Sequence, residues 1–182
     1  MSLTQYYTAT SLDGFIAAPG HSLEWLLRRA TDPEAPMAYG SFIREVGAMA
    51  MGANTYEWLV RHEFGDADPS SWTWPYEMPC WVFTHRDLPV SPGSGVTLTR
   101  DDPADVHAAM AAAAGGRNLW LVGGGELVGL FADRGLLDEI IVSIAPVTLG
   151  AGAPLLPRHL ELRREELAIN GEFVCARLTV VR

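Results

Sequence analysis

Short apolar stretches recur along this chain and alternate with segments in which apolar residues return every three or four positions. Runs rich in apolar, β-branched or aromatic residues are typical of buried strands. These runs cover residues 4–10, 15–18, 48–51, 80–84, 119–122 and 140–149. The turn signal Ser11-Leu12-Asp13-Gly14 separates the first two of them.

Helical segments lie between these strands. Helical spacing is expected over residues 23–29, from residue 36 to Gly47, from Asn54 onward, and over 126–134. Asn54 and Glu57 have the spacing of a capping box. The clearest helix start is Asp102-Pro103, an acidic cap followed by proline at the first helical position, and this helix stops at Gly115-Gly116.

Asn170-Gly171 lies between two strand-like runs and predicts a hairpin with a type I′ turn. The alternation of strands and helices predicts an α/β fold, with a mainly parallel central sheet and helices on both faces. The C-terminal hairpin would add an antiparallel edge. The chain shows no repeat or linker, so we expect residues 1–182 to form a single domain.

The clearest chemical signal is an apolar strand that runs into Gly123-Gly124-Gly125, with a helix starting at Glu126. Glycines let a ligand approach the backbone, and a helix N-terminus offers free N–H groups and a positive dipole end. This combination suits a pyrophosphate. The spacing is neither a dinucleotide fingerprint nor a P-loop. The alternative is a tight turn without a ligand.

Two more strand ends show similar chemistry. Gly52, Asn54 and Thr55 follow the strand over 48–51, where either an anion site or a plain helix cap explains them. Thr84-His85-Arg86 follows the strand over 80–84 and supplies groups suited to a ribose 2′-phosphate, or else forms a solvated loop. Ligands of such sheets bind beyond the carboxyl ends of the strands.

Composition narrows the choice of partners. All 13 basic residues are Arg, against 22 acids, for a net charge of −9, so we expect no nucleic-acid partner. No apolar stretch approaches the length of about 18 residues that a membrane-spanning helix needs. The two cysteines and five histidines are scattered, so we expect no metal site and a cytoplasmic protein.

Asp13 is a candidate for orienting a substrate or a proton-donating water, although an aspartate in a turn usually bonds its own backbone. Trp25, Trp58, Trp72 and Trp74 are candidates for the wall of a flat-ring pocket, although core packing is the commoner use of tryptophan. No GxSxG elbow of a hydrolase is present.

Four motifs together resemble a known family. They are residues 7–14 (YTATSLDG), 51–57 (MGANTYE), 82–86 (VFTHR) and 121–127 (LVGGGEL), followed by LLDEI at 136–140. Their order is similar to that in the dihydrofolate-reductase-like superfamily, in the branch of the RibD C-terminal reductase domain of riboflavin biosynthesis. The likeness covers nearly the whole chain, and the combination is more specific than any single motif.

The resemblance implies a three-layer dihydrofolate-reductase-like fold, NADPH as cofactor and a homodimer. Ala9 and Thr10 would face the nicotinamide. Gly52, Asn54 and Thr55 would lie along the adenosine-phosphate side, with Thr84, His85 and Arg86 near the 2′-phosphate. The pyrophosphate would be held by residues 123–127, which are Gly123, Gly124, Gly125, Glu126 and Leu127. Asp13, Trp25 and Tyr56 would border the substrate.

The activity implied is that of an NADPH-dependent reductase, which passes hydride to a C=N or C=O of a small pyrimidine- or pterin-like molecule. It would resemble 5-amino-6-(5-phosphoribosylamino)uracil reductase, with Asp13 organising proton delivery. Tyr7 stands where the riboflavin enzymes carry a lysine, and Gly123 stands where they carry an acid. The alternatives are an NADP(H)-binding protein without reductase activity and a structural dimer that binds no nucleotide.

Overall fold

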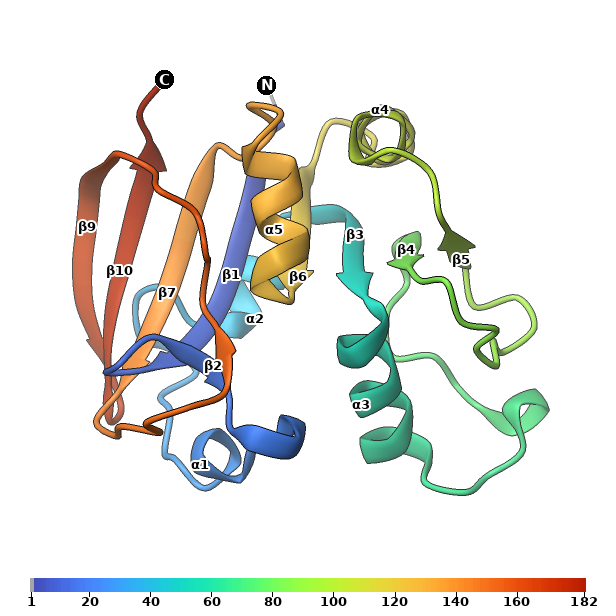
Figure 1. The fold of residues 1–182 in the computed structure, drawn as a ribbon, viewed down its shortest axis with the longest axis horizontal. Coiled ribbons are helices and arrows are strands. Elements are labelled where there is room, and N and C mark those ends of the chain that lie inside the picture. The colour runs from blue at the N-terminus through green and yellow to red at the C-terminus, as the bar shows by residue number, and fades with distance from the viewer. Residues whose placement is uncertain (1) are drawn as a thin grey trace.

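An eight-stranded sheet forms the centre of the protein, in the computed structural model that describes residues 2–182. The strand order is β5-β4-β3-β6-β1-β7-β10-β9 (Figure 1). The strands are β1 (Thr4–Ser11), β3 (Val46–Gly52), β4 (Cys80–Phe83), β5 (Val96–Thr99), β6 (Asn118–Gly123), β7 (Glu139–Ala145), β9 (Leu162–Asn170) and β10 (Phe173–Val180). Two short strands, β2 (Phe15–Ala17) and β8 (Ala153–Pro154), pair with each other beside it.

The six strands from β5 to β7 run parallel, and β10 lies antiparallel to both β7 and β9. The predicted mainly parallel sheet with a C-terminal antiparallel hairpin is therefore confirmed. β1 lies between β6 and β7, where its residue Tyr6 pairs with Leu121 on one side and Ile140 on the other. Its central place is consistent with the aromatic and β-branched residues that dominate residues 4–10.

Helices cover both faces of the sheet, as the sequence predicts. On one face α4 (Pro103–Ala113) and α5 (Gly125–Ala132) pack with Tyr6, Ala50 and Leu121. On the other face α2 (Tyr39–Arg44) and α3 (Ala53–Phe64) pack with Met49, Met51 and other buried residues. Figure 1 shows α5 in front of the sheet and α2 behind it. A short helix, α1 (Glu24–Leu27), lies beyond the lower ends of the parallel strands.

Several predicted boundaries were wrong. The helix expected to reach Gly47 ends at Arg44, because Val46 and Gly47 already belong to β3. Gly47 is needed there, since a Cβ at this position would overlap the backbone of Ala114 at the end of α4. The strand β5 was not predicted, and β7 ends at Ala145 instead of residue 149.

The hairpin exists, but its turn differs from the predicted one. Asn170 pairs with Phe173, so the two loop residues are Gly171 and Glu172. Only Gly171 has a positive φ, of 56°. A glycine at the first loop position matches a type II′ turn, whereas type I′ needs a positive φ at both loop positions.

The cap of Asp102 is confirmed, because its carboxylate accepts a hydrogen bond from the N–H of Ala104. Within residues 2–182, no helix has both the length and the apolar character that a bilayer crossing requires.

Candidate functional site

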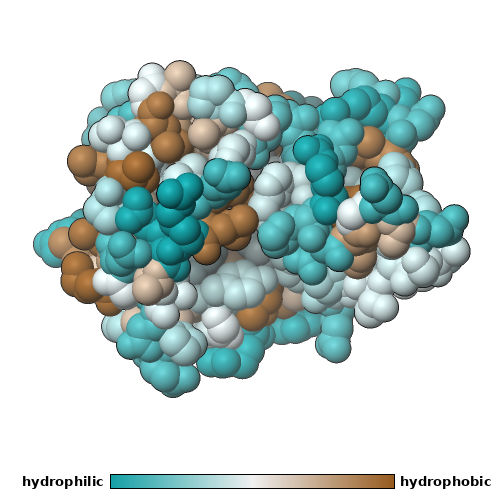
Figure 2. Space-filling model, turned by 90° about the horizontal axis from the view of Figure 1, so that it is seen from below, coloured by the Kyte–Doolittle hydropathy of each residue, from teal (hydrophilic) through white to brown (hydrophobic). Residues whose placement is uncertain are grey.

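A cavity of about 980 Å³ opens at the carboxyl ends of the central parallel strands. Residues of β1, β3, β6 and β7 line it, together with residues of α1, α2, α3 and α5. Figure 2 looks onto this end of the molecule and shows a hollow between two lobes. The cavity therefore lies where ligands of open α/β sheets bind.

The three glycines after β6 have three different physical roles. Gly123 has a φ of 137°, which favours glycine, and a cis peptide bond joins it to Gly124. At Gly124 an added Cβ would meet only Cδ1 of Ile16, at 3.8 Å, so this backbone faces the cavity. At Gly125 an added Cβ would overlap the carbonyl oxygens of Pro154 and Leu155. Gly125 is thus required by chain packing, and Gly124 leaves room for a ligand.

Two helix N-termini meet at this turn. Gly124 is the N-cap of α5 and Gly52 is the N-cap of α3, and neither helix has a side-chain cap. A Cβ on Gly52 would lie 3.8 Å from both the carbonyl oxygen of Gly123 and the nitrogen of Gly124. The first N–H groups of both helices therefore remain available beside one cavity, which is the chemistry of an anion site.

The structure corrects the predicted capping box at Asn54. The N-cap is Gly52, two residues before Asn54, and the Asn54 side chain instead accepts a hydrogen bond of 2.6 Å from Arg86. The Arg86 guanidinium also pairs with Glu57 at 2.6 Å. These two contacts hold a half-exposed cation beside the first turn of α3.

Arg86 also lines a second cavity, of about 340 Å³, with Thr84 and Arg100 among its neighbours. The Thr84 hydroxyl accepts a hydrogen bond from the backbone N–H of Arg86, at 2.9 Å. Of the three predicted 2′-phosphate residues, Arg86 reaches the main cavity, Thr84 lines the smaller one, and His85 lines neither.

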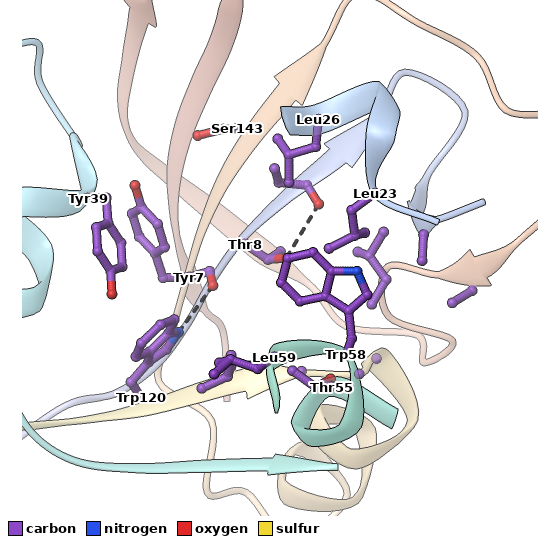
Figure 3. A pocket seen from close by; sticks show the side chains of 18 of the residues that line it. Tyr7, Thr8, Leu23, Leu26, Tyr39, Thr55, Trp58, Leu59, Trp120 and Ser143 are labelled. Atoms are coloured by element: carbon purple, nitrogen blue, oxygen red, sulfur yellow. Dashed lines mark hydrogen bonds between the residues drawn. The ribbon is translucent and has the colours of Figure 1, made fainter. Parts of the chain in front are cut away.

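The half of the main cavity beside β1 is aromatic and aliphatic (Figure 3). Tyr7 stacks on Phe42 with ring centroids 4.2 Å apart and donates a hydrogen bond to the carbonyl of Met37. The indole N–H of Trp120 donates to the carbonyl of Tyr7, at 3.2 Å. Burial raises the pKa of Tyr7 to about 12, so its hydroxyl stays protonated and keeps its donor role.

Trp58 of α3 forms the opposite wall, facing Leu23 and Leu26 from the region of α1 (Figure 3). Ser143 lines the cavity from β7, with its hydroxyl 3.3 Å from the Sγ atom of the buried Cys175.

Besides Thr84 and His85, four predicted site residues do not line the main cavity. The Thr10 hydroxyl is buried and donates within β1 and to Phe15. Trp25 is buried in the core beside α1, and Tyr56 is buried with its hydroxyl donating to the carbonyl of Pro89. Their apolar surfaces stabilise the fold, so their predicted contacts with nicotinamide or substrate are not supported by their positions.

Asp13 is the fourth of these residues. Its carboxylate accepts hydrogen bonds from the N–H groups of Leu149 and Gly150 and from the Ser11 hydroxyl. These bonds, with the Ser11 hydroxyl foremost, lower the pKa of Asp13 to about 2. Asp13 thus joins two loops outside the cavity lining, a position that does not support its predicted part in proton delivery.

The remaining predicted cofactor residues do line the cavity. They are Ala9, Gly52, Asn54, Thr55, Arg86, Gly123, Gly124, Gly125, Glu126 and Leu127. Among residues 2–182 no three His, Cys, Asp or Glu side chains gather as metal ligands.

Sequence comparison assigns this architecture to a family. The profile of the RibD C-terminal domain matches residues 4–175. The chain belongs to the RibD C-terminal domain family. It is 32% identical over 169 residues to YwjB of Bacillus subtilis, covering 92% of this chain and 89% of that one. It is 25% identical to YyaP of the same organism, over 81% and 76% of the two chains. Both relatives are functionally uncharacterized.

Solved structures agree with this assignment. A Shewanella sp. PV-4 protein named after riboflavin biosynthesis superposes with a TM-score of 0.79 and 25% identity, over 99% of both chains. RibD of Acinetobacter baumannii gives a TM-score of 0.68 at 17% identity, where this chain spans 59% of the larger protein. The RibD C-terminal family is reductase-like, and the fold is dihydrofolate-reductase-like, as the sequence motifs indicate.

Sequence reasoning missed most of the aromatic half. The missed lining residues include Tyr7, Tyr39, Tyr76, Trp120 and Ser143. Only the alternation along β1 and β7 carried a signal, because these inner strands are neighbours in which Tyr7 pairs with Ile141 and Ala9 with Ser143. That signal requires the strand order, which local patterns do not contain.

Proposed function

We propose that this protein is an NADPH-dependent reductase, acting on a C=N or C=O of a small heterocyclic molecule of pyrimidine or pterin type. One observation carries the proposal: two helix N-termini without side-chain caps meet at the Gly123–Gly124 turn and open into one cavity beside Arg86. The geometry fits a dinucleotide, because both helix ends offer N–H donors and Gly124 leaves space for phosphate oxygens.

Each part of the cavity has its own task in this proposal. The N–H groups at the start of α5, together with Gly52 and Thr55, would hold the pyrophosphate. Arg86 would contact the 2′-phosphate, with Thr84 ordering its backbone. Ala9, at the floor of the cavity on β1, would lie near the nicotinamide.

When bound, NADPH supplies a hydride, so the acceptor carbon gains hydrogen with two electrons while the adjacent oxygen or nitrogen gains a proton. The protein orients the two rings and excludes water with Tyr7, Trp58 and Trp120. Reductase activity in related domains supports this assignment at the level of the family.

We also propose a homodimer. Val174 pairs with Ile169 across β9 and β10, and Leu167 lies two residues along on the same face. These side chains are 49%, 65% and 57% exposed. An exposed apolar cluster on an edge hairpin is typical of an interface. Sedimentation should give a dimer that Ile169→Asp converts to a monomer; a monomeric wild type would refute this.

Titration calorimetry with NADPH and NADH tests the proposed function directly. We expect NADPH to bind, and to bind more tightly than NADH. Its oxidation with pterin or pyrimidine acceptors would then be followed at the nicotinamide absorbance. If NADPH binds but no acceptor oxidises it, the protein is a nucleotide-binding protein without reductase activity. If neither nucleotide binds, the proposal is refuted.

A further inference from the structure

The aromatic half of the cavity carries flat and apolar side chains on its walls. The indole of Trp58 stacks on His62, with ring centroids 4.7 Å apart and planes 12° apart, and the rest of the ring lines the cavity. Leu23 and Leu26 face it from the region of α1 (Figure 3). Apolar walls of this kind hold a planar conjugated ring by offset stacking and dispersion.

The charges on the cavity wall are acidic or already paired. Within residues 2–182, the carboxylates on the lining are Asp32 and Glu126, of which Glu126, at the start of α5, pairs with Arg158. The one arginine is Arg86, which pairs with Glu57. Asp32 lies at the aromatic half: its N–H donates to Asn170, a further lining residue, at 2.8 Å. The whole chain carries a net charge of −9. A negative group on a molecule in this half would therefore be repelled.

We propose that the substrate is a planar conjugated carbonyl or imine compound that carries no phosphate. This inference rests on the proposed function and names the substrate class of the same site. The dinucleotide phosphates are held at the helix N-termini and Arg86, and the acidic, aromatic half takes an uncharged ring.

A matched pair of probes tests this class. Pyridoxal and pyridoxal 5′-phosphate share one pyridine ring and differ at the 5′ position, a hydroxyl against a phosphate. In water the hydroxyl of pyridoxal largely closes on its aldehyde to a cyclic hemiacetal, so the pair compares the ring and the charge, not the aldehyde. The chain contains no lysine, so side-chain imines with these aldehydes do not complicate the titration. With NADP⁺ at saturation, quenching of tryptophan fluorescence reports binding, because Trp58 and Trp120 line the cavity. We expect pyridoxal to bind about two- to fivefold more tightly, the effect of one partly screened charge contact.

Charge variants sharpen the test. Leu27 lines the cavity and is 55% exposed, so Leu27→Arg adds a cation at the rim with little effect on packing. It should strengthen binding of pyridoxal 5′-phosphate by about two- to fivefold and leave pyridoxal unchanged. Leu130→Arg is the matched control, because Leu130 is 40% exposed on α5 and does not line the cavity. It should change neither affinity.

The outcomes separate the two proposals. Equal or tighter binding of the phosphorylated probe, binding of neither probe, or an unselective effect of Leu27→Arg overturns the substrate class. Calorimetry with NADPH alone, without any ring compound, decides the proposed function. If the protein binds NADPH but prefers pyridoxal 5′-phosphate, the proposed function stands and the proposed substrate class is wrong.

Discussion

The two halves of the cavity differ in what they are made of. The half proposed to hold the phosphates, called here the phosphate half, consists mainly of backbone groups at two strand-to-helix junctions, Gly52–Ala53 and Gly123–Gly125, which lie side by side. The aromatic half consists of side chains from segments far apart in the chain, among them Tyr7, Trp58 and Trp120. The geometry of a site made of backbone is fixed by the fold, whereas the specificity of a site made of side chains changes when those side chains are substituted. We therefore expect substitutions in the two halves to affect different measurements.

The largest effect is expected from Gly125→Ala. The added Cβ would overlap two backbone carbonyls, which cannot rotate away, so we expect a loss of about 1–3 kcal/mol in the free energy of unfolding. Urea denaturation measures it.

Gly124→Ala is the matched control, because its Cβ meets only Ile16 at 3.8 Å. Its stability should stay within about 0.5 kcal/mol of wild type. Its NADPH affinity should nevertheless fall at least about tenfold, a loss of about 1.4 kcal/mol, because the methyl group occupies the space of the phosphate. Full NADPH affinity in Gly124→Ala would show that the turn holds no nucleotide.

Next in size is the effect of Arg86→Ala on cofactor choice. A charged hydrogen bond to a phosphate contributes about 1.5–3 kcal/mol, so the preference for NADPH over NADH should fall by about 10- to 100-fold. Calorimetry with both nucleotides measures the ratio. Arg61→Ala, on the exposed side of α3, should leave it unchanged. If Arg86→Ala keeps the preference, the 2′-phosphate lies elsewhere.

Trp58→Leu should weaken ligand binding in the aromatic half alone. Loss of one stacking wall costs about 0.5–1.5 kcal/mol, so affinity for a planar ligand such as pyridoxal should fall by about two- to tenfold, with NADPH affinity unchanged. Trp81→Leu is a control on β4, where the side chain packs against the core on the α4–α5 face. It should lower stability and spare ligand binding. Equal losses for both ligands in Trp58→Leu would mean that the halves are not separable.

The smallest effect is expected from Asp13→Ala. The folded-state pKa of about 2 lies below the ordinary value of 3.8, so the carboxylate stabilises the fold fully above about pH 4 and progressively less as the pH falls toward 2. The melting temperatures of wild type and variant should differ at neutral pH and converge in acid. NADPH binding should be unaffected. A selective loss of turnover at full stability would restore the catalytic role that the sequence suggests for this residue.

The two glycine junctions of the phosphate half could be predicted from the sequence because their signals are local, whereas the ligand they hold stays a prediction. Three glycines before a helix, and a glycine between a strand and a helix, have the same meaning wherever the sheet places them. The local signals were weaker where a side chain had a choice of partners. Asn54 has the pattern of a cap, yet it bonds Arg86, which lies 32 residues away in the chain.

The side chains of the aromatic half could not be predicted, because they come from segments that only the tertiary structure brings together. Trp25 lies in α1 and Trp58 in α3, but only Trp58 lines the cavity. Asp13 and its partners Leu149 and Gly150 are brought together only when β1 pairs with β7.

The sequence by itself determined the order of strands and helices, the parallel sheet with its antiparallel hairpin, and the glycine junctions at the strand ends. These features follow from periodicity and from the restricted backbone of glycine and proline, which act over a few residues. The tertiary structure alone decided which side chains face the cavity and which are used in packing. That choice depends on strand order and register, and these are fixed by contacts between residues more than a hundred positions apart, such as those of Tyr6 with Leu121 and Ile140.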